Sequence, residues 1–215
     1  MQNSILRPCH RGAGEAEALL DAGLALMVAS GGRRPRVADI VTAAGSSNDA
    51  FYRCFGSKDA LVEAVVERGA RTVVGYVRHR IARAAGDGPE AQLRAGLAAV
   101  VRQASDAELA RRTRAVLANA TGQAPPYAGH LGVALVDALA ALFARPAAEL
   151  GAADPLRAAR ATAGAVVASL QYWLFTEEVP GPAEVEHLLG FLLAGVRAPG
   201  PRAGRRVLDA RMPFC

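Results

Sequence analysis

The sequence has little cysteine, few aromatic residues and almost no lysine. Its three cysteines, Cys9, Cys54 and Cys215, lie far apart and form no Cys-x-x-Cys pair. An odd number of scattered cysteines argues against a secreted disulfide framework, and their spacing does not suit a zinc site. We therefore expect reduced thiols in a cytoplasmic protein that has neither a metal nor a cofactor.

Long apolar runs are also lacking. The most apolar stretches, residues 131–144 and 161–175, are short and include Asp137 or Gln171. A membrane-spanning helix needs about 20 apolar residues, and the first residues have no apolar signal-peptide core. We expect no membrane segment, and in a cytoplasmic chain the Asn119-Ala-Thr121 glycosylation pattern is an accident of common residues.

Positive charge gathers at the two ends of the chain. The net charge is +5, but residues 59–196 hold 13 Lys and Arg against 14 Asp and Glu. Residues 1–58 hold seven basic residues against five acidic ones, and residues 197–215 hold five against one. A near-neutral middle with basic ends permits binding to a polyanion without requiring it.

Apolar residues recur at helical spacing along almost the whole chain, and no alternating strand pattern appears. Gly and Pro clusters interrupt this pattern often enough to predict an all-α protein of about nine helices. Helices before residue 58 are short, and a 25-residue amphipathic run follows. We expect four segments: a flexible arm (1–14), a three-helix head (15–58), a larger helical body (59–197) and a disordered basic tail (198–215).

The last three helical stretches of the body, near residues 127–150, 155–178 and 183–197, are apolar on more than one face. A surface helix needs only one apolar stripe, so these extra faces belong to a central core or to a subunit interface. For the last two we favour the interface, because nothing follows them in the chain that covers them.

Residues 37–55 are typical of a helix-turn-helix. The stretch VADIVTAA places apolar residues on one face, Gly45 suits the left-handed turn, and Ser47 is placed to cap a second short helix. Ser57 is placed to cap the long helix that follows. The small residues at the corner allow the two short helices to cross steeply.

In a helix-turn-helix the second helix enters the major groove of DNA. Asn48 suits adenine, Asp49 suits cytosine or acts as a first-turn dipole partner, and Arg53 suits guanine or phosphate. Lys58, the only lysine, would add charge beside a helix N-terminus that attracts phosphate. The DNA-contacting candidates are Arg36, Ser46, Ser47, Asn48, Asp49, Tyr52, Arg53 and Lys58.

The aromatic residues of this stretch have different expected roles. Phe51 and Phe55 are four residues apart, so both lie on one helix face, and we expect them in the core. Tyr52 points elsewhere, and a phosphate contact or simple packing both remain open. A redox switch at Cys54 is a further hypothesis.

The stretch from AEALLDAGLALMVASGG to SSNDAFYRCFGSKDALVEAV, about residues 15–65, resembles the TetR/AcrR family of transcriptional regulators. The positions in register with the family pattern are Ile40, Ala44, Gly45, Ser47, Phe51, Tyr52, Phe55, Ser57, Lys58 and Leu61. The sequence departs from that pattern at Arg36, Val41, Ser46 and the Asn48-Asp49 pair.

The resemblance implies a homodimeric regulator that binds a double-stranded DNA operator. It also implies that the remaining 140 or so residues bind a small-molecule effector, that the last two helices form the dimer interface, and that effector binding releases a repressor from its operator. Helices near residues 88–150 would wall the effector pocket. The effector-binding candidates are Tyr127, His130, Tyr172 and Trp173, for each of which a place in the core or in the subunit interface is the favoured alternative. Arg102, Arg111, Arg112 and Arg114 either counter an anionic effector or lie on a solvated face.

Two alternatives remain open. An all-helical enzyme is one, but the four histidines are scattered, no metal-ligand spacing appears, and the GAGEAE stretch follows no strand. We therefore expect no enzymatic activity. The other alternative is a dimeric small-molecule sensor or interaction protein without specific DNA recognition, which the acidic Asp49 and the sparse charge of the head favour.

Overall fold

The computed structural model describes residues 13–120 and 125–197. Within these residues the chain forms nine α-helices, one short 3-10 turn and no strand, as the all-α prediction requires. The predicted tail at 198–215 lies outside the described residues, and so does the predicted arm except for its last two residues, which begin the first helix. None of the described helices is both long and apolar enough to cross a membrane.

Two of the three helices before residue 58 are short and a long one follows, as predicted, but the first helix has 17 residues and is not short. The first four helices are α1 (Ala13–Ala29), α2 (Val37–Ala43), α3 (Asn48–Phe55) and α4 (Lys58–Arg83). The 3-10 turn η1 (Ala85–Asp87) and five further helices follow: α5 (Pro89–Ser105), α6 (Ala107–Ala120), α7 (Pro125–Glu149), α8 (Pro155–Thr176) and α9 (Pro182–Arg197).

Local sequence signals explain where α2, α3 and α4 begin and end. Gly45 follows α2 with φ +61°, a backbone conformation that residues with a side chain rarely adopt. The amide of Ser46 donates to the Val41 carbonyl oxygen at 2.8 Å. The Ser47 hydroxyl oxygen accepts from the amide of Ala50 at the start of α3, and Ser57 caps α4 in the same way. The two predicted capping roles are therefore confirmed.

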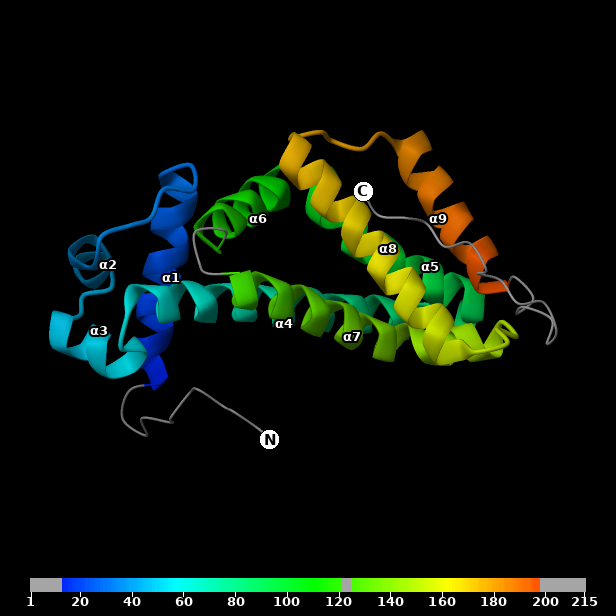
Figure 1. The fold of residues 1–215 in the computed structure, drawn as a ribbon, viewed down its shortest axis with the longest axis horizontal. Coiled ribbons are helices and arrows are strands. Elements are labelled where there is room, and N and C mark those ends of the chain that lie inside the picture. The colour runs from blue at the N-terminus through cyan, green and yellow to red at the C-terminus, as the bar shows by residue number, and fades with distance from the viewer. Residues whose placement is uncertain (1–12, 121–124, 198–215) are drawn as a thin grey trace, which may run out of the picture.

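The core consists of two clusters, and α4 belongs to both. One cluster, the core of the head, joins α1, α2, α3 and the first turns of α4, and Phe51 is fully buried at its centre. The other joins the far half of α4 to α5–α9 and forms the core of the body. In Figure 1 the head lies at one end of the long axis, α9 at the other end, and α4 runs between them.

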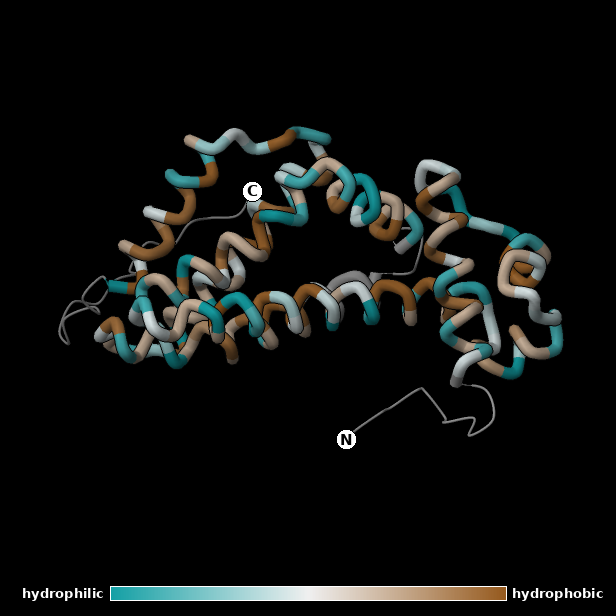
Figure 2. The backbone as a smooth tube through the Cα atoms, turned by 180° about the vertical axis from the view of Figure 1, so that it is seen from behind, coloured by the Kyte–Doolittle hydropathy of each residue, from teal (hydrophilic) through white to brown (hydrophobic). Residues whose placement is uncertain are grey.

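The apolar helices α8 and α9 divide their side chains between the body core and the surface. Val166, Leu170 and Trp173 are buried in the body core. Other large apolar side chains on these helices are exposed, with exposed fractions of 57% for Tyr172, 68% for Phe175 and 68% for Phe191. In Figure 2 brown and teal segments alternate along α9, at the left of the view, as expected of a helix with apolar and polar residues in turn.

Candidate nucleic-acid interface

Helix α3 presents a polar face to solvent. Its inner face is fixed by Ala50 and Phe51, which are buried, and by Phe55, whose ring centroid lies 5.8 Å from that of Phe51. The predicted core positions of Phe51 and Phe55 are therefore confirmed, with Phe55 only partly buried. The opposite face consists of four exposed candidates, Asn48, Asp49, Tyr52 and Arg53.

Tyr52 stands outward from the aromatic core. Its ring meets that of Phe51 edge-on, with centroids 5.3 Å apart, and 54% of the residue remains exposed. Packing therefore fixes one edge of the ring and leaves much of the residue at the surface, so the two roles predicted for Tyr52 are compatible.

Arg53 is held by two carboxylates. Its Nη1 lies 3.0 Å from Oδ2 of Asp49, one turn earlier on α3, and its Nη2 lies 3.0 Å from Oε2 of Glu15 on α1. Glu15 also accepts a hydrogen bond from the Ser46 hydroxyl at 2.9 Å. Asp49 thus has a third role besides the two predicted, as an ion-pair partner of Arg53.

Two other candidate cations of the head are not engaged in this way. Arg36 is exposed just before α2 and Lys58 is half-buried at the first position of α4. Within the described part of the chain no ion pair involves either of them. By contrast, Nη2 of Arg34 lies 2.7 Å from Oδ1 of Asp59. Arg36 and Lys58 therefore carry positive charges of the head that no described carboxylate pairs with.

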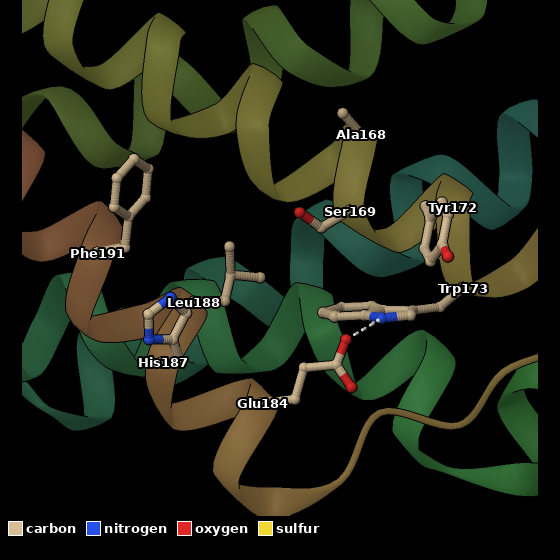
Figure 3. Close-up of a pocket in the computed structure, with 8 residues that line it drawn as sticks. All are labelled: Ala168, Ser169, Tyr172, Trp173, Glu184, His187, Leu188 and Phe191. Carbon is tan, nitrogen blue, oxygen red and sulfur yellow. Dashed lines mark hydrogen bonds between the residues drawn. The ribbon is translucent and has the colours of Figure 1, made fainter.

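The candidate effector residues Tyr172 and Trp173 lie in an open groove of about 560 Å³ between α8 and α9 (Figure 3). Trp173 is 3% exposed and its Nε1–H donates to Oε1 of Glu184 at 2.8 Å. His187 and Phe191 line the same groove. None of the described side chains between residues 88 and 150 lines it. The side chains of Tyr127 and His130 lie outside the described residues.

The arginines considered for an anionic effector do not all lie together, although Arg111 and Arg112 line one groove beside α1. Arg102 lies over the ring of Tyr76, 5.4 Å from its centroid, and its Nη1 donates to the Tyr76 hydroxyl at 3.1 Å. This hydrogen bond lowers the pKa of Tyr76 below its ordinary value. Arg111 is paired with Glu108, and Nη1 of Arg114 is buried without a hydrogen-bond partner. The described residues therefore do not bring all four arginines into one anion site.

Sequence reasoning missed Glu15 as part of the site. The residue is 38 positions from Arg53, and its own neighbourhood contains no motif that points to α3. Only the packing of α1 against α3 brings the two together.

Residues 19–65 match the family model described as bacterial regulatory proteins, tetR family. This match covers α3 and most of the candidate interface, and it confirms the resemblance that the sequence suggested. No curated protein matches the chain.

Solved structures with the same fold include three bacterial regulators. A TetR-family transcriptional regulator from Mesorhizobium loti is 22% identical, with a TM-score of 0.60, covering 86% of this chain and 95% of that one. One from Pectobacterium atrosepticum is 18% identical with a TM-score of 0.63, covering 88% and 94%. The fatty acid degradation regulator FadR from Bacillus halodurans is 18% identical with a TM-score of 0.60, covering 83% and 98%. At these identities the likeness concerns the fold.

Proposed function

The head of this chain belongs to the TetR family of bacterial regulatory proteins, and from this premise we propose that the protein is a homodimeric, effector-controlled transcriptional repressor. The observation that carries the proposal is the outward polar face of α3. Four side chains able to reach a groove stand on a short helix that the buried Phe51 holds in place. In a helix-turn-helix this is the helix that reads base edges.

Within this proposal the candidates have different tasks. Asn48 and Arg53 read base edges, since amide and guanidinium groups pair with adenine and guanine respectively. Lys58 and Arg36 contact phosphates and fix the register of the protein on the duplex, which contributes affinity but no sequence preference. When Arg53 binds DNA, its guanidinium group either leaves Glu15 and Asp49 or contacts them and the DNA together. The two carboxylates therefore reduce the contribution of Arg53 to DNA affinity.

We propose that the exposed apolar side chains of α8 and α9 pair two copies of the chain. Tyr172, Phe175 and Phe191 leave a surface apolar enough to favour a partner. If a two-fold axis passes through this surface, each of these residues occurs twice in the interface, once from each copy. Such a dimer would present two α3 helices to successive major grooves, which lie about 34–36 Å apart.

The body is proposed to bind a small-molecule effector and to bias the position of the head. An effector controls DNA binding only if it binds one of two head positions more tightly than the other. We propose release of the operator on effector binding, a cytoplasmic location and no catalytic activity, as the family resemblance implies.

A second candidate function is a dimeric sensor without specific DNA recognition. The specific observation in its favour is that Glu15 and Asp49 neutralise the one arginine on the reading face of α3. An interface with two carboxylates repels phosphate, so weak or non-specific DNA binding would result.

Selection of bound fragments from random DNA duplexes separates the two functions. The repressor is expected to enrich two related half-sites about one helical turn apart. The logarithm of its binding constant should fall with the logarithm of salt concentration by roughly 0.9 for each phosphate contact. Binding that enriches no sequence would favour the sensor, and no binding at any salt concentration would reject the repressor.

A further inference from the structure

A buried asparagine joins the body to the head. Asn119 lies one residue before the end of α6 and is 1% exposed. Its Nδ2 donates two hydrogen bonds of 2.8 Å, one to the carbonyl oxygen of Ala115 within α6 and one to that of Gly32. Gly32 belongs to the turn between α1 and α2, 87 residues away, so the side chain connects two parts of the chain that no local signal links.

The turn between α1 and α2 approaches α6 so closely at Gly32 that the residue at this position must be small. Gly32 has φ +88°, and a Cβ atom there would lie 3.0 Å from Cβ of Ala118 and 3.6 Å from Cα of Ala115. A side chain at position 32 would therefore be strained by its own backbone and would push α6 away. Only glycine lets Nδ2 of Asn119 reach the Gly32 carbonyl oxygen at this spacing.

A second contact supports the same turn. Nη2 of Arg34 lies 3.5 Å from the backbone carbonyl oxygen of Asn119 and 2.7 Å from Oδ1 of Asp59 in the first turn of α4. The hydrogen bond to Asn119 is long, so the ion pair to Asp59 is the stronger part of this contact. Arg34 thereby links the turn to α4 as well as to α6.

The last turns of α6 lie between the two cores. Val116 packs against the core of the head, and Leu117, the next residue, packs against the core of the body. Any displacement of this end of α6 therefore moves groups that belong to the head and to the body at once.

Contact between α1 and α6 is close at one end and open at the other. Near Gly32 the turn that follows α1 touches α6, whereas further along a groove of about 490 Å³ separates Leu24 and Val28 of α1 from Arg111 and Arg112 of α6. The close contact near Gly32 therefore holds the head against this end of α6, while open space lies between α1 and the other end of α6.

We propose that the hydrogen bond from Asn119 to Gly32 holds the head in one position on the body. The proposal rests on the proposed function, in which the separation of two α3 helices decides operator binding. Asn119 is in this view a positioning residue. Movement at the end of α6 withdraws its amide from Gly32, leaves the partly buried Gly32 carbonyl oxygen without this donor and lets the head shift.

The test compares Asn119→Ala with a matched control on the same helix. Thr113→Val removes another side-chain hydrogen bond of α6, that to Gln103 of α5 at 3.3 Å, and does not touch the head. Amide hydrogen exchange is measured along the full chain in both variants, together with affinity for the duplex that the wild-type protein selects.

In Asn119→Ala we expect exchange of the amides of Ser30, Gly31 and Gly32 to rise roughly tenfold, because loss of the donor to the partly buried Gly32 carbonyl oxygen destabilises the turn. Exchange in α8 and α9 should stay at its wild-type level, and operator affinity should fall by about tenfold. Thr113→Val should change neither the turn nor operator affinity. Gly32→Ala changes the other partner of the hydrogen bond, and it should likewise raise exchange in the turn and lower operator affinity.

Unchanged exchange in the turn would overturn the proposal, and so would raised exchange with unchanged operator affinity, since the bond would then be structural only. If the wild-type protein selects no DNA, the proposed repressor function fails. The exchange measurement then still decides whether Asn119 controls the order of the head.

Discussion

Oε2 of Glu15 lies 3.0 Å from Nη2 of Arg53, which ties the first turn of α1 to the outward face of α3. The pair is partly exposed, with the two side chains 35% and 53% accessible, so its contribution to folding is at most about 1 kcal/mol. Its larger effect is on the charge that α3 presents. A carboxylate at this position opposes the approach of phosphate.

Glu15→Gln should therefore strengthen DNA binding while leaving stability nearly unchanged. Removing one negative charge close to the duplex should raise affinity roughly fivefold at low salt, and the gain should shrink as salt screens it. Fluorescence anisotropy over a salt series measures this effect. Glu149→Gln removes an equal charge from an ion pair with Arg145 on α7, outside the head. Equal affinities for the two variants would contradict the placement of Glu15 beside bound DNA.

Lys58→Ala and Asn48→Ala should weaken DNA binding in different ways. Loss of Lys58 should lower affinity evenly across sequences and reduce the salt slope by about 0.9, since one phosphate contact disappears. Loss of Asn48 should relax one base position by about 1–3 kcal/mol. Selection from random duplexes and salt titration give the two readouts. Arg157→Ala, at an exposed arginine in the first turn of α8, is the control for loss of charge. Identical behaviour of the Lys58 and Asn48 variants would show that the two roles are wrongly assigned.

Phe51→Ala should unfold the head or come close to doing so. The side chain is fully buried among α1, α2 and α4, and removing a buried phenylalanine costs about 3–5 kcal/mol. Urea denaturation followed by circular dichroism measures the loss. Tyr52→Phe removes only the hydroxyl of the neighbouring, mostly exposed tyrosine and should change stability by less than about 0.5 kcal/mol. A small effect of Phe51→Ala would mean that Phe51 does not support α3.

Features of the head that depend on nearby residues were predictable from the sequence. Gly45, Ser47 and Ser57 act on partners within five residues, so their types and positions sufficed to place the turn and the starts of α3 and α4. The helical period of the apolar residues likewise gave the number of helices. These signals are local because capping and turn formation are local.

Contacts between distant residues were not predictable in this way. Arg53 donates a hydrogen bond to Glu15, 38 positions away in the sequence, and Asn119 donates one to Gly32, 87 positions away. Neither pair has a spacing rule, because the first depends on the packing of α1 against α3 and the second on the packing of the α1–α2 turn against α6. For the same reason the sequence did not reveal that Trp173 would be buried and the adjacent Tyr172 exposed.

Acid should weaken the start of α6 through Asp106. Its Oδ1 accepts hydrogen bonds from the amides of Leu109 and Glu108, each at 3.1 Å, and the bond from Leu109 is the main cause that lowers the pKa of Asp106. A carboxyl group with a lowered folded-state pKa stabilises the fold above its unfolded pKa, and this stabilisation is lost as pH falls through the folded value.

Asp106→Asn tests this effect, because asparagine caps a helix without titrating. The wild-type protein should be the more stable of the two at neutral pH, and the difference should shrink below a pH of about 4. Thermal unfolding at several pH values measures it. A difference that stays constant with pH would mean that the charge of Asp106 does not matter.

Phe191→Glu should separate the proposed dimer without unfolding the chain. The side chain is 68% exposed in one copy, so a charge there meets water and costs little in the monomer. In a two-fold interface the same change buries two unpaired carboxylates, which is strongly unfavourable. Sedimentation velocity over a concentration series should show a dimer for the wild-type protein and a monomer for the variant. Val133→Glu, at a 62% exposed residue of α7, is the matched control and should stay dimeric. A dimer that survives Phe191→Glu would place the interface elsewhere, whereas its loss together with operator binding would connect the α8–α9 surface to the spacing of the two α3 helices.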